Sequence, residues 1–220
     1  METILVYGDS LAWGIIPDTR QRLPFEQRWP GVLELRLHGY RIKARVVEDC
    51  LNGRRTVWAD PFKPGRQGIN ELAQRIEIHS PLALVILALG TNDFQATHQH
   101  DAWLSAQGIA ACIQAIQQAP IEPGMPRPPI LVVAPPPITQ PRGAIAGKFK
   151  DAEKRCLGAA DAYRRVCGQF DQVAFFDAAD VAVTSPIDGV HLDAAEHQKL
   201  GLALAEVVAP LLSQARRSIG

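Results

Sequence analysis

Short apolar runs alternate along the chain with segments of helical periodicity, and this alternation constrains the fold more than any other feature. Leu84–Leu89 and Ile130–Ala134 are almost wholly apolar, as expected for central parallel strands that helices cover on both faces. Thr3–Tyr7, Lys43–Glu48 and Val173–Phe176 are further runs of strand length. The alternation predicts an α/β fold in which a doubly wound parallel sheet lies between two layers of helices.

The helices between these strands are predicted from apolar residues that recur every three to four positions. Asp193 is predicted as the N-cap of the last helix, with Glu196 as its reciprocal capping partner. A chain of 220 residues without an evident linker is expected to form one domain over residues 1–220. The predicted helices are Trp29–Leu37, Gly68–His79, Ser105–Gln118, Asp151–Phe170 and Asp193–Leu212.

Charge and apolar patterning disfavour several classes of partner. Lys plus Arg and Asp plus Glu both number 23, so neither a nucleic acid nor a membrane surface is an expected partner, and self-association is easier. The longest apolar stretch, Leu82 to Leu89, is too short to cross a bilayer. The amino terminus lacks a signal-peptide pattern, so a cytoplasmic protein is expected. The cysteines lack CxxC spacing and are predicted to be reduced: Cys50, Cys112, Cys156 and Cys167.

A serine follows the first predicted strand, in the sequence Gly8-Asp9-Ser10-Leu11. Ligand sites in doubly wound sheets lie at the carboxyl ends of the strands, which is where Ser10 is expected. A hydroxyl becomes an effective nucleophile only with a base, a group that orients the base, and donors for the oxyanion. Asp9 is expected to hydrogen-bond the turn rather than to join this set.

A candidate base and orienting acid occur near the end of the chain, in Asp188-Gly189-Val190-His191. Gly189 permits a tight turn that brings the carboxylate to Nδ1 of the imidazole while Nε2 faces outward. His191 could then accept the Ser10 proton and return it to a leaving group. The alternatives are a surface turn beside a helix cap, or Asp193 as the orienting acid.

Candidate oxyanion donors follow two other predicted strands. Asn92, in Gly90-Thr91-Asn92-Asp93, comes after the most apolar strand, and its side-chain amide could donate to a developing negative charge. Gly53 could offer an unobstructed backbone N–H after the second strand. Read alone, Asn92 is an ordinary strand-end turn residue, and Asn52-Gly53 is an ordinary turn.

These blocks occur in order, each after a different predicted strand, and together they make the chain resemble the SGNH (GDSL) hydrolase family. The resemblance rests on Gly8–Leu11, Gly53, Gly90–Asp93 and the pair Asp188 and His191, so it spans nearly the whole chain. Within that family the chain is most similar to bacterial arylesterases with acyltransferase or perhydrolase side activity. The Gly-x-Ser-x-Gly elbow of α/β-hydrolases is absent.

The resemblance implies a role for each residue of the set. Ser10 would be the nucleophile, His191 the general base and acid, and Asp188 the group that orients the imidazole. The Ser10 N–H, the Gly53 N–H and the Asn92 amide would form the oxyanion hole. The implied fold is a flavodoxin-like three-layer sandwich around a five-stranded parallel sheet. The implied assembly is a homo-oligomer, the substrate is a small ester, and no cofactor is required.

Other residues allow two interpretations each. Trp13 could wall an acyl pocket and Phe149 could sit at its entrance, or both could pack in the core. Arg54 and Arg55 could receive an anionic substrate, although solvated side chains are the preferred interpretation. The long connections at residues 51–68, 122–129 and 138–148 are expected to form a pocket rim.

The remaining histidines are interpreted as surface residues. His98, His100 and Asp101 resemble a short metal-binding pattern, but a solvated loop before a helix is preferred because no further ligand group lies nearby in the sequence. No metal site is therefore expected. Three other histidines are predicted on helix surfaces: His38, His79 and His197.

The leading hypothesis is a serine esterase that hydrolyses short-chain or aryl carboxylic esters through an acyl-enzyme, with acyl transfer to alcohols or peroxide as a side activity. A carbohydrate or lysophospholipid deacylase, or a thioesterase, could use the same residues. A non-catalytic flavodoxin-like binding protein is the alternative from another class. It is disfavoured because Asp9 would lie where a bound phosphate needs backbone N–H groups.

Overall fold

The computed structural model describes residues 1–217, and its centre is a five-stranded sheet in the order β2-β1-β3-β4-β5. All four strand pairs are parallel. The chain crosses from one side of β1 to the other between β2 and β3, so a topological switch point lies beside β1. The strands are β1 Glu2–Gly8, β2 Ala44–Cys50, β3 Leu84–Ala88, β4 Ile130–Ala134 and β5 Val173–Asp177.

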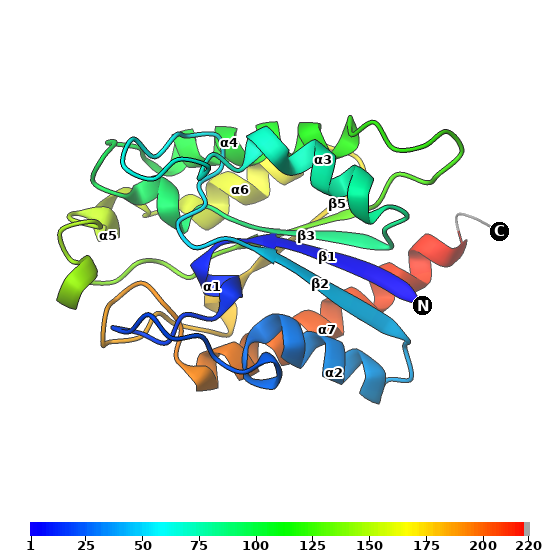
Figure 1. Ribbon diagram of the computed structural model, residues 1–220, viewed down its shortest axis with the longest axis horizontal. Coiled ribbons are helices and arrows are strands. Elements are labelled where there is room, and N and C mark those ends of the chain that lie inside the picture. The colour runs from blue at the N-terminus through cyan, green and yellow to red at the C-terminus, as the bar shows by residue number, and fades with distance from the viewer. Residues whose placement is uncertain (218–220) are drawn as a thin grey trace.

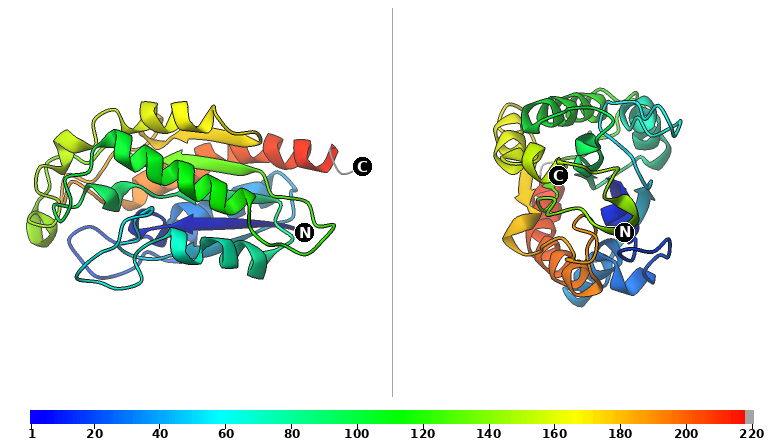
Figure 2. Two further views of the ribbon diagram at one scale, coloured as in Figure 1. Left: turned by 90° about the horizontal axis from the view of Figure 1, so that it is seen from above. Right: turned by 90° about the vertical axis from the view of Figure 1, so that its left-hand side faces the viewer.

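Helices cover both faces of this sheet, which confirms the predicted three-layer α/β/α sandwich (Figure 1). One face carries α3 (Ile69–His79), α4 (Ala102–Gln117) and α6 (Ala159–Cys167), and the other carries α2 (Trp29–Gly39) and α7 (Ala194–Arg217). The end-on view in Figure 2 separates the two helical layers. None of the helices in residues 1–217 combines the length and the apolar character that a membrane span requires.

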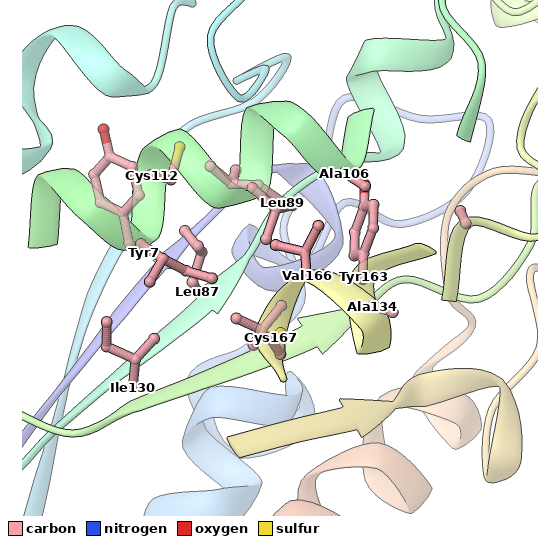
Figure 3. Close-up of a cluster of buried hydrophobic side chains, with 14 of the residues drawn as sticks. Tyr7, Leu87, Leu89, Ala106, Cys112, Ile130, Ala134, Tyr163, Val166 and Cys167 are labelled. Carbon is pink, nitrogen blue, oxygen red and sulfur yellow. The ribbon is translucent and has the colours of Figure 1, made fainter. Parts of the chain in front are cut away.

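The alternation of side chains along the strands builds two apolar cores. On the α4 and α6 face, Tyr7 and Leu87 of the sheet pack with Cys112 and Val166 of the helices (Figure 3). On the α2 and α7 face, the core includes side chains from β1, β3 and β4 together with the helices. The four cysteines, predicted to be reduced, are free: Cys50, Cys112, Cys156 and Cys167.

Two predicted helices differ from the structure. The helix predicted over Asp151–Phe170 is broken: α5 covers Ala152–Arg155, and α6 starts only at Ala159. Gly158 between them has a φ of +77°, a left-handed conformation that interrupts a right-handed helix. Helix α4 begins before Ser105 because the Asp101 carboxylate accepts a hydrogen bond of 2.9 Å from the Leu104 N–H and caps it.

The start of α7 follows the sequence prediction only in part. Asp193 directly precedes the helix, and its carbonyl accepts bonds from the Glu196 and His197 N–H groups. The Glu196 carboxylate does not make the predicted capping box. It accepts bonds from the Val183 N–H at 3.0 Å and from the Lys199 ammonium at 2.7 Å, so it ties α7 to the preceding loop.

The three long connections do not share one end of the sheet, in contrast to the prediction. Residues 126–129 lead into the amino end of β4 and line a cavity of about 940 Å³ with Glu2 and Leu82. Strand β1 starts at this end, so the cavity and Ser10 lie at opposite ends of β1. The connections at residues 51–68 and 138–148 reach the carboxyl ends of the strands, where α1 and α5 lie (Figure 1).

His197, predicted on a helix surface, is instead fully buried where α7 meets α2. Its Nδ1 accepts a hydrogen bond of 3.2 Å from the Trp29 N–H, so the ring must be neutral at this nitrogen. Burial lowers the pKa of His197 to about 3, and the nearby charges of His191 and Arg28 add to the effect. The error arose because the helical pattern of α7 does not show which neighbour covers this position.

This burial predicts a pH dependence of stability. Below the ordinary histidine pKa of about 6.5 the unfolded chain binds a proton that the folded chain cannot, so acidification lowers the free energy of unfolding until about pH 3. Between pH 7.5 and pH 5 the expected loss from this residue is about 2 kcal/mol. Urea unfolding at both pH values measures this loss in wild type and in His197→Asn, which keeps an acceptor for Trp29. The free energy of unfolding should fall by about 2 kcal/mol less in the variant than in wild type. Equal losses in the two proteins would contradict the assignment.

Candidate active site

Ser10 begins α1 (Ser10–Trp13) directly beyond the carboxyl end of β1. Asp9 caps this short helix: its Oδ1 accepts a hydrogen bond of 2.9 Å from the Leu11 N–H, as predicted. Ser10 is 5% exposed. Within residues 1–217 the Ser10 N–H has no protein acceptor, so this N–H remains available for a ligand.

The turn between Asp188 and His191 folds the carboxylate back onto the imidazole. Oδ1 of Asp188 accepts bonds of 2.9 Å from the N–H groups of both Val190 and His191, and Oδ2 accepts one of 2.7 Å from the ring Nδ1. Gly189 has a φ of +78°, and a Cβ there would lie 2.3 Å from the Gln140 carbonyl oxygen. Only glycine fits this position, and it allows the chain to turn tightly between Asp188 and His191.

The turn brings His191 to Ser10, although the two residues are 181 positions apart in the sequence: Nε2 of His191 lies 3.2 Å from Ser10 Oγ. Burial alone would raise the pKa of Asp188, but hydrogen bonds from the His191 ring and backbone lower it to about 2. The carboxylate is therefore ionised at neutral pH and can hold the ring with its proton on Nδ1. In that tautomer Nε2 has the free electron pair that a proton from Ser10 requires.

Asn92 follows β3 in a 3₁₀ helix, η2 (Thr91–Phe94), and lies beside Asp9, the residue before Ser10. The chain enters η2 through Gly90, which has a φ of +126° and no room for a side chain. A Cβ at Gly90 would lie 2.0 Å from the Tyr163 hydroxyl oxygen. The close approach of α6 to this turn therefore requires glycine and fixes where Asn92 stands.

The side-chain amide of Asn92 is held at both ends. Its Nδ2 donates to Asp9 Oδ2 at 3.0 Å, and its Oδ1 accepts from Gln95 Nε2 at 2.7 Å. These bonds fix which end of the amide is the donor and leave one N–H of Nδ2 for a ligand. Burial raises the pKa of Asp9 to about 6, although the bonds from Leu11 and Asn92 oppose that rise.

Arg54 and Arg55 are buried, which corrects the prediction of solvated side chains. Arg54 Nη1 donates to the Gly8 carbonyl at 3.0 Å, and Nη2 donates to Asp49 Oδ1 at 2.8 Å. The guanidinium also lies over the Tyr7 ring, at 3.8 Å from its centroid. These hydrogen bonds of Arg54 hold the turn that contains Gly53 against the carboxyl ends of β1 and β2.

Arg55 does not reach the candidate site directly. It acts through Gln95, a residue that the sequence analysis did not single out. Its Nη2 donates to Gln95 Oε1 at 2.6 Å, and Gln95 in turn holds Asn92. Asp60 lies 3.7 Å from the same guanidinium nitrogen. A continuous polar chain thus runs from Arg55 to Asp9 and positions the amide of Asn92. The only signal in the sequence was the pair of arginines directly after Gly53.

The Gly53 N–H is available for a ligand, like that of Ser10, because it has no protein acceptor in the described chain. Trp13 is half-buried, and the Arg22 guanidinium lies 4.8 Å from the centroid of its ring. Phe149 is 3% exposed and packs in the apolar core, which agrees with the packing interpretation. The ammonium of its neighbour Lys148 instead lies 4.0 Å from the point that a Cβ on Gly53 would occupy.

His98 and His100 stack on each other, with ring centroids 4.9 Å apart, and His100 also lies 4.0 Å from the Trp58 ring. Asp101 caps α4, as described above. Among the described residues no cluster of three or more His, Cys, Asp or Glu side chains could hold a metal ion. These histidines are accounted for by ring stacking beside the start of α4.

Comparison with known proteins places the chain in a family. The sequence profile of the GDSL-like lipase/acylhydrolase family matches residues 6–199. A carbohydrate acetylesterase family member from Sinorhizobium meliloti is 34% identical, covers 97% of this chain and 100% of its own, and superposes with a TM-score of 0.90. An aryl esterase from M. smegmatis is 34% identical, covers 96% of this chain and 100% of its own, and has a TM-score of 0.88.

A search of curated proteins found no match. The family profile nevertheless spans most of the chain. The solved relative from Sinorhizobium meliloti is similar to this chain both in sequence and in its fold. The chain therefore belongs to the GDSL-like lipase/acylhydrolase (SGNH hydrolase) family, and it is a carboxylic-ester hydrolase.

Proposed function

We propose that the protein hydrolyses esters through a covalent acyl-enzyme on Ser10, with His191 as general base and acid and Asp188 as the orienting carboxylate. The observation that carries this proposal is the series of contacts from Asp188 Oδ2 to His191 Nδ1 at 2.7 Å and from Nε2 to Ser10 Oγ at 3.2 Å. A hydroxyl, a base and an orienting acid in hydrogen-bond sequence are the arrangement that nucleophilic catalysis needs.

The proposed reaction has two balanced halves. Ser10 Oγ forms a bond to the ester carbonyl carbon while its proton passes to His191 Nε2, and the tetrahedral intermediate then expels the alcohol with that proton. Water next attacks the acyl-enzyme, gives its proton to His191, and releases the acid as Ser10 regains its hydrogen. Asp188 stays ionised throughout and stabilises the imidazolium.

We assign the oxyanion to three donors: the Ser10 N–H, the Gly53 N–H and the free N–H of Asn92 Nδ2. Each is fixed before the substrate arrives: Ser10 by the Asp9 cap, the Gly53 turn by Arg54, and Asn92 by Gln95. Donors that need not reorganise stabilise the developing charge most effectively, and the loss of one typically costs about 10²–10³ in kcat.

We propose short-chain and aryl esters as the substrate class. The support is the resemblance to proteins described as an acetylesterase and an aryl esterase, each about one-third identical over nearly the whole chain. A buried nucleophile, with Ser10 only 5% exposed, also favours small acyl groups. We further propose acyl transfer as a side reaction, because any nucleophile that replaces water in the second half would take the acyl group.

A series of 4-nitrophenyl esters from acetate to octanoate tests the acyl-chain proposal. The expected kcat/KM is highest for acetate or the next homologues and at least about tenfold lower for octanoate, because each surplus methylene must fit a site with little room. A kcat/KM that rises steadily toward octanoate would contradict a small acyl site and would favour a long-chain lipase.

An acetylated sugar is the second candidate substrate, favoured by the Sinorhizobium meliloti relative. Both candidates would release acetate through the same residues, so only the alcohol portion distinguishes them. Acetate release from a peracetylated monosaccharide, compared with release from phenyl acetate, would decide between them. A faster reaction with phenyl acetate supports the aryl-ester proposal, whereas a faster reaction with the sugar supports the alternative.

We also propose that the protein assembles into homo-oligomers, which light scattering on the purified protein would test.

A further inference from the structure

Positively charged side chains from three loops gather beside the Gly53 turn. The point that a Cβ on Gly53 would occupy lies 3.8 Å from Arg66 Cδ, 3.9 Å from Arg66 Nε and 4.0 Å from Lys148 Nζ. Lys63 and Arg20 lie close enough to act electrostatically on these groups. We refer to Arg20, Lys63, Arg66 and Lys148 as the cationic rim.

The charges of the cationic rim repel one another. Although the Lys148 side chain as a whole is exposed, its pKa is lowered by partial desolvation of the ammonium and by the charge of Lys63, while Asp60 opposes the shift. The pKa of Lys63 is likewise lowered by desolvation and by the charges of Arg66 and Arg20. Such a grouping does not stabilise the fold by itself, so its presence calls for a negative partner.

Among the described side chains, Asp60 supplies only part of that negative charge. Ion pairs among them involve no member of the cationic rim. Asp60, the acid that acts on Lys148, is 6% exposed at its side chain and lies 3.7 Å from Arg55, which offsets its charge. The Arg66 guanidinium donates to the carbonyls of Asn52 and Pro64. Because the whole chain has a formal net charge of zero, the four positive charges of the cationic rim do not reflect a positive excess of the whole chain.

We propose that the cationic rim binds a carboxylate carried by the substrate, so that the enzyme prefers esters with an anionic acyl or alcohol part to their neutral counterparts. This inference rests on the proposed function, because Gly53 is there an oxyanion donor and the ester carbonyl must bind beside it. A carboxylate a few bonds from that carbonyl then reaches Lys148. A group of charges of one sign also raises the local concentration of ligands of the opposite sign.

Matched ester pairs on the intact protein test the proposal. For the alcohol part the pair is 3-acetoxybenzoate and its methyl ester. For the acyl part it is the 4-nitrophenyl monoester of adipate and its methyl ester. The measured quantity is the ratio of kcat/KM for the anionic ester to that for the neutral ester, in wild type and in Lys148→Met. Lys150→Met, which removes the same charge two positions along the chain on an exposed side chain, is the control.

The ratio for at least one pair is expected to fall about fivefold or more in Lys148→Met, and further in Lys148→Glu, because one close charge at a solvated site contributes on that scale. It should stay near the wild-type value in Lys150→Met and should decrease in wild type as salt is added. The pair that responds identifies which part of the ester carries the anion.

Two results would overturn the proposal. Ratios unchanged in Lys148→Met for both pairs would show that the cationic rim does not select anions. An equal loss with the anionic and neutral esters would show that Lys148 acts on the oxyanion rather than on a substrate carboxylate. Failure of the proposed function is distinguishable, because Ser10→Ala would then still hydrolyse the neutral esters.

Discussion

Replacement of Ser10 by alanine is expected to lower kcat/KM for 4-nitrophenyl acetate by roughly 10⁴–10⁶-fold, leaving the rate that binding and oxyanion stabilisation alone provide. The substitution removes the hydroxyl whose oxygen lies 3.2 Å from His191 Nε2. It keeps the Ser10 backbone N–H and the Asp9 cap, so the oxyanion donors stay in place. Steady-state kinetics with the purified variant measure the loss.

The matched control is Ser213→Ala, which removes an exposed hydroxyl from α7 and should leave kcat/KM unchanged. Circular dichroism and the melting temperature verify that Ser10→Ala remains folded. Turnover by a folded Ser10→Ala at more than a few per cent of the wild-type rate would assign the nucleophile to another residue.

Replacement of Asp188 by asparagine is expected to lower kcat by roughly 10³–10⁴-fold. The carboxylate accepts the Nδ1–H bond of His191 at 2.7 Å. An amide that presents its NH₂ there favours the opposite tautomer, which puts the proton on Nε2 and leaves no base for Ser10. The oxygen of the amide can still accept the Val190 and His191 N–H bonds, so the turn should keep its shape.

Asp193→Asn is the matched control, because Asp193 was the alternative orienting acid. The described structure shows no hydrogen bond from its side chain to His191 or Ser10, and its carbonyl accepts the N–H groups of Glu196 and His197. The variant should retain nearly full activity. A large loss in Asp193→Asn combined with a mild loss in Asp188→Asn would reverse the assignment.

The fold was largely predictable because the apolar runs are short, regular and separated by helical patterns. A buried central strand such as β3 must be apolar at nearly every position, and this requirement is visible without any knowledge of neighbours. The break between α5 and α6 was not predictable in the same way. It depends on the left-handed conformation of Gly158, which the helical pattern around it does not reveal.

The candidate site was predictable as far as it depends on turns at strand ends. Ser10, Asn92 and the pair Asp188 and His191 each follow a strand, and the structure brings them to one edge of the sheet. Gly53 also lies there, on a turn fastened to Gly8.

The residues that hold these groups could not be predicted, because their roles depend on partners distant in sequence. Arg54 and Arg55 look solvated in a polar loop, but in the structure they bind the end of β1 and Gln95 respectively. His197 has the same explanation: only the packing of α2 on α7 shows that it is buried. The errors on Arg54, Arg55 and His197 all concerned what covers a side chain, which is a tertiary property.

Covalent labelling tests the central claim most directly. The protein is treated with a fluorophosphonate, which forms a bond to an activated serine oxygen and releases fluoride, and the modified peptide is identified by mass spectrometry. The account predicts one adduct, on Ser10, that appears in parallel with the loss of esterase activity and is greatly slowed in Asp188→Asn. An adduct on a different residue, or complete inactivation with Ser10 unmodified, would contradict the account.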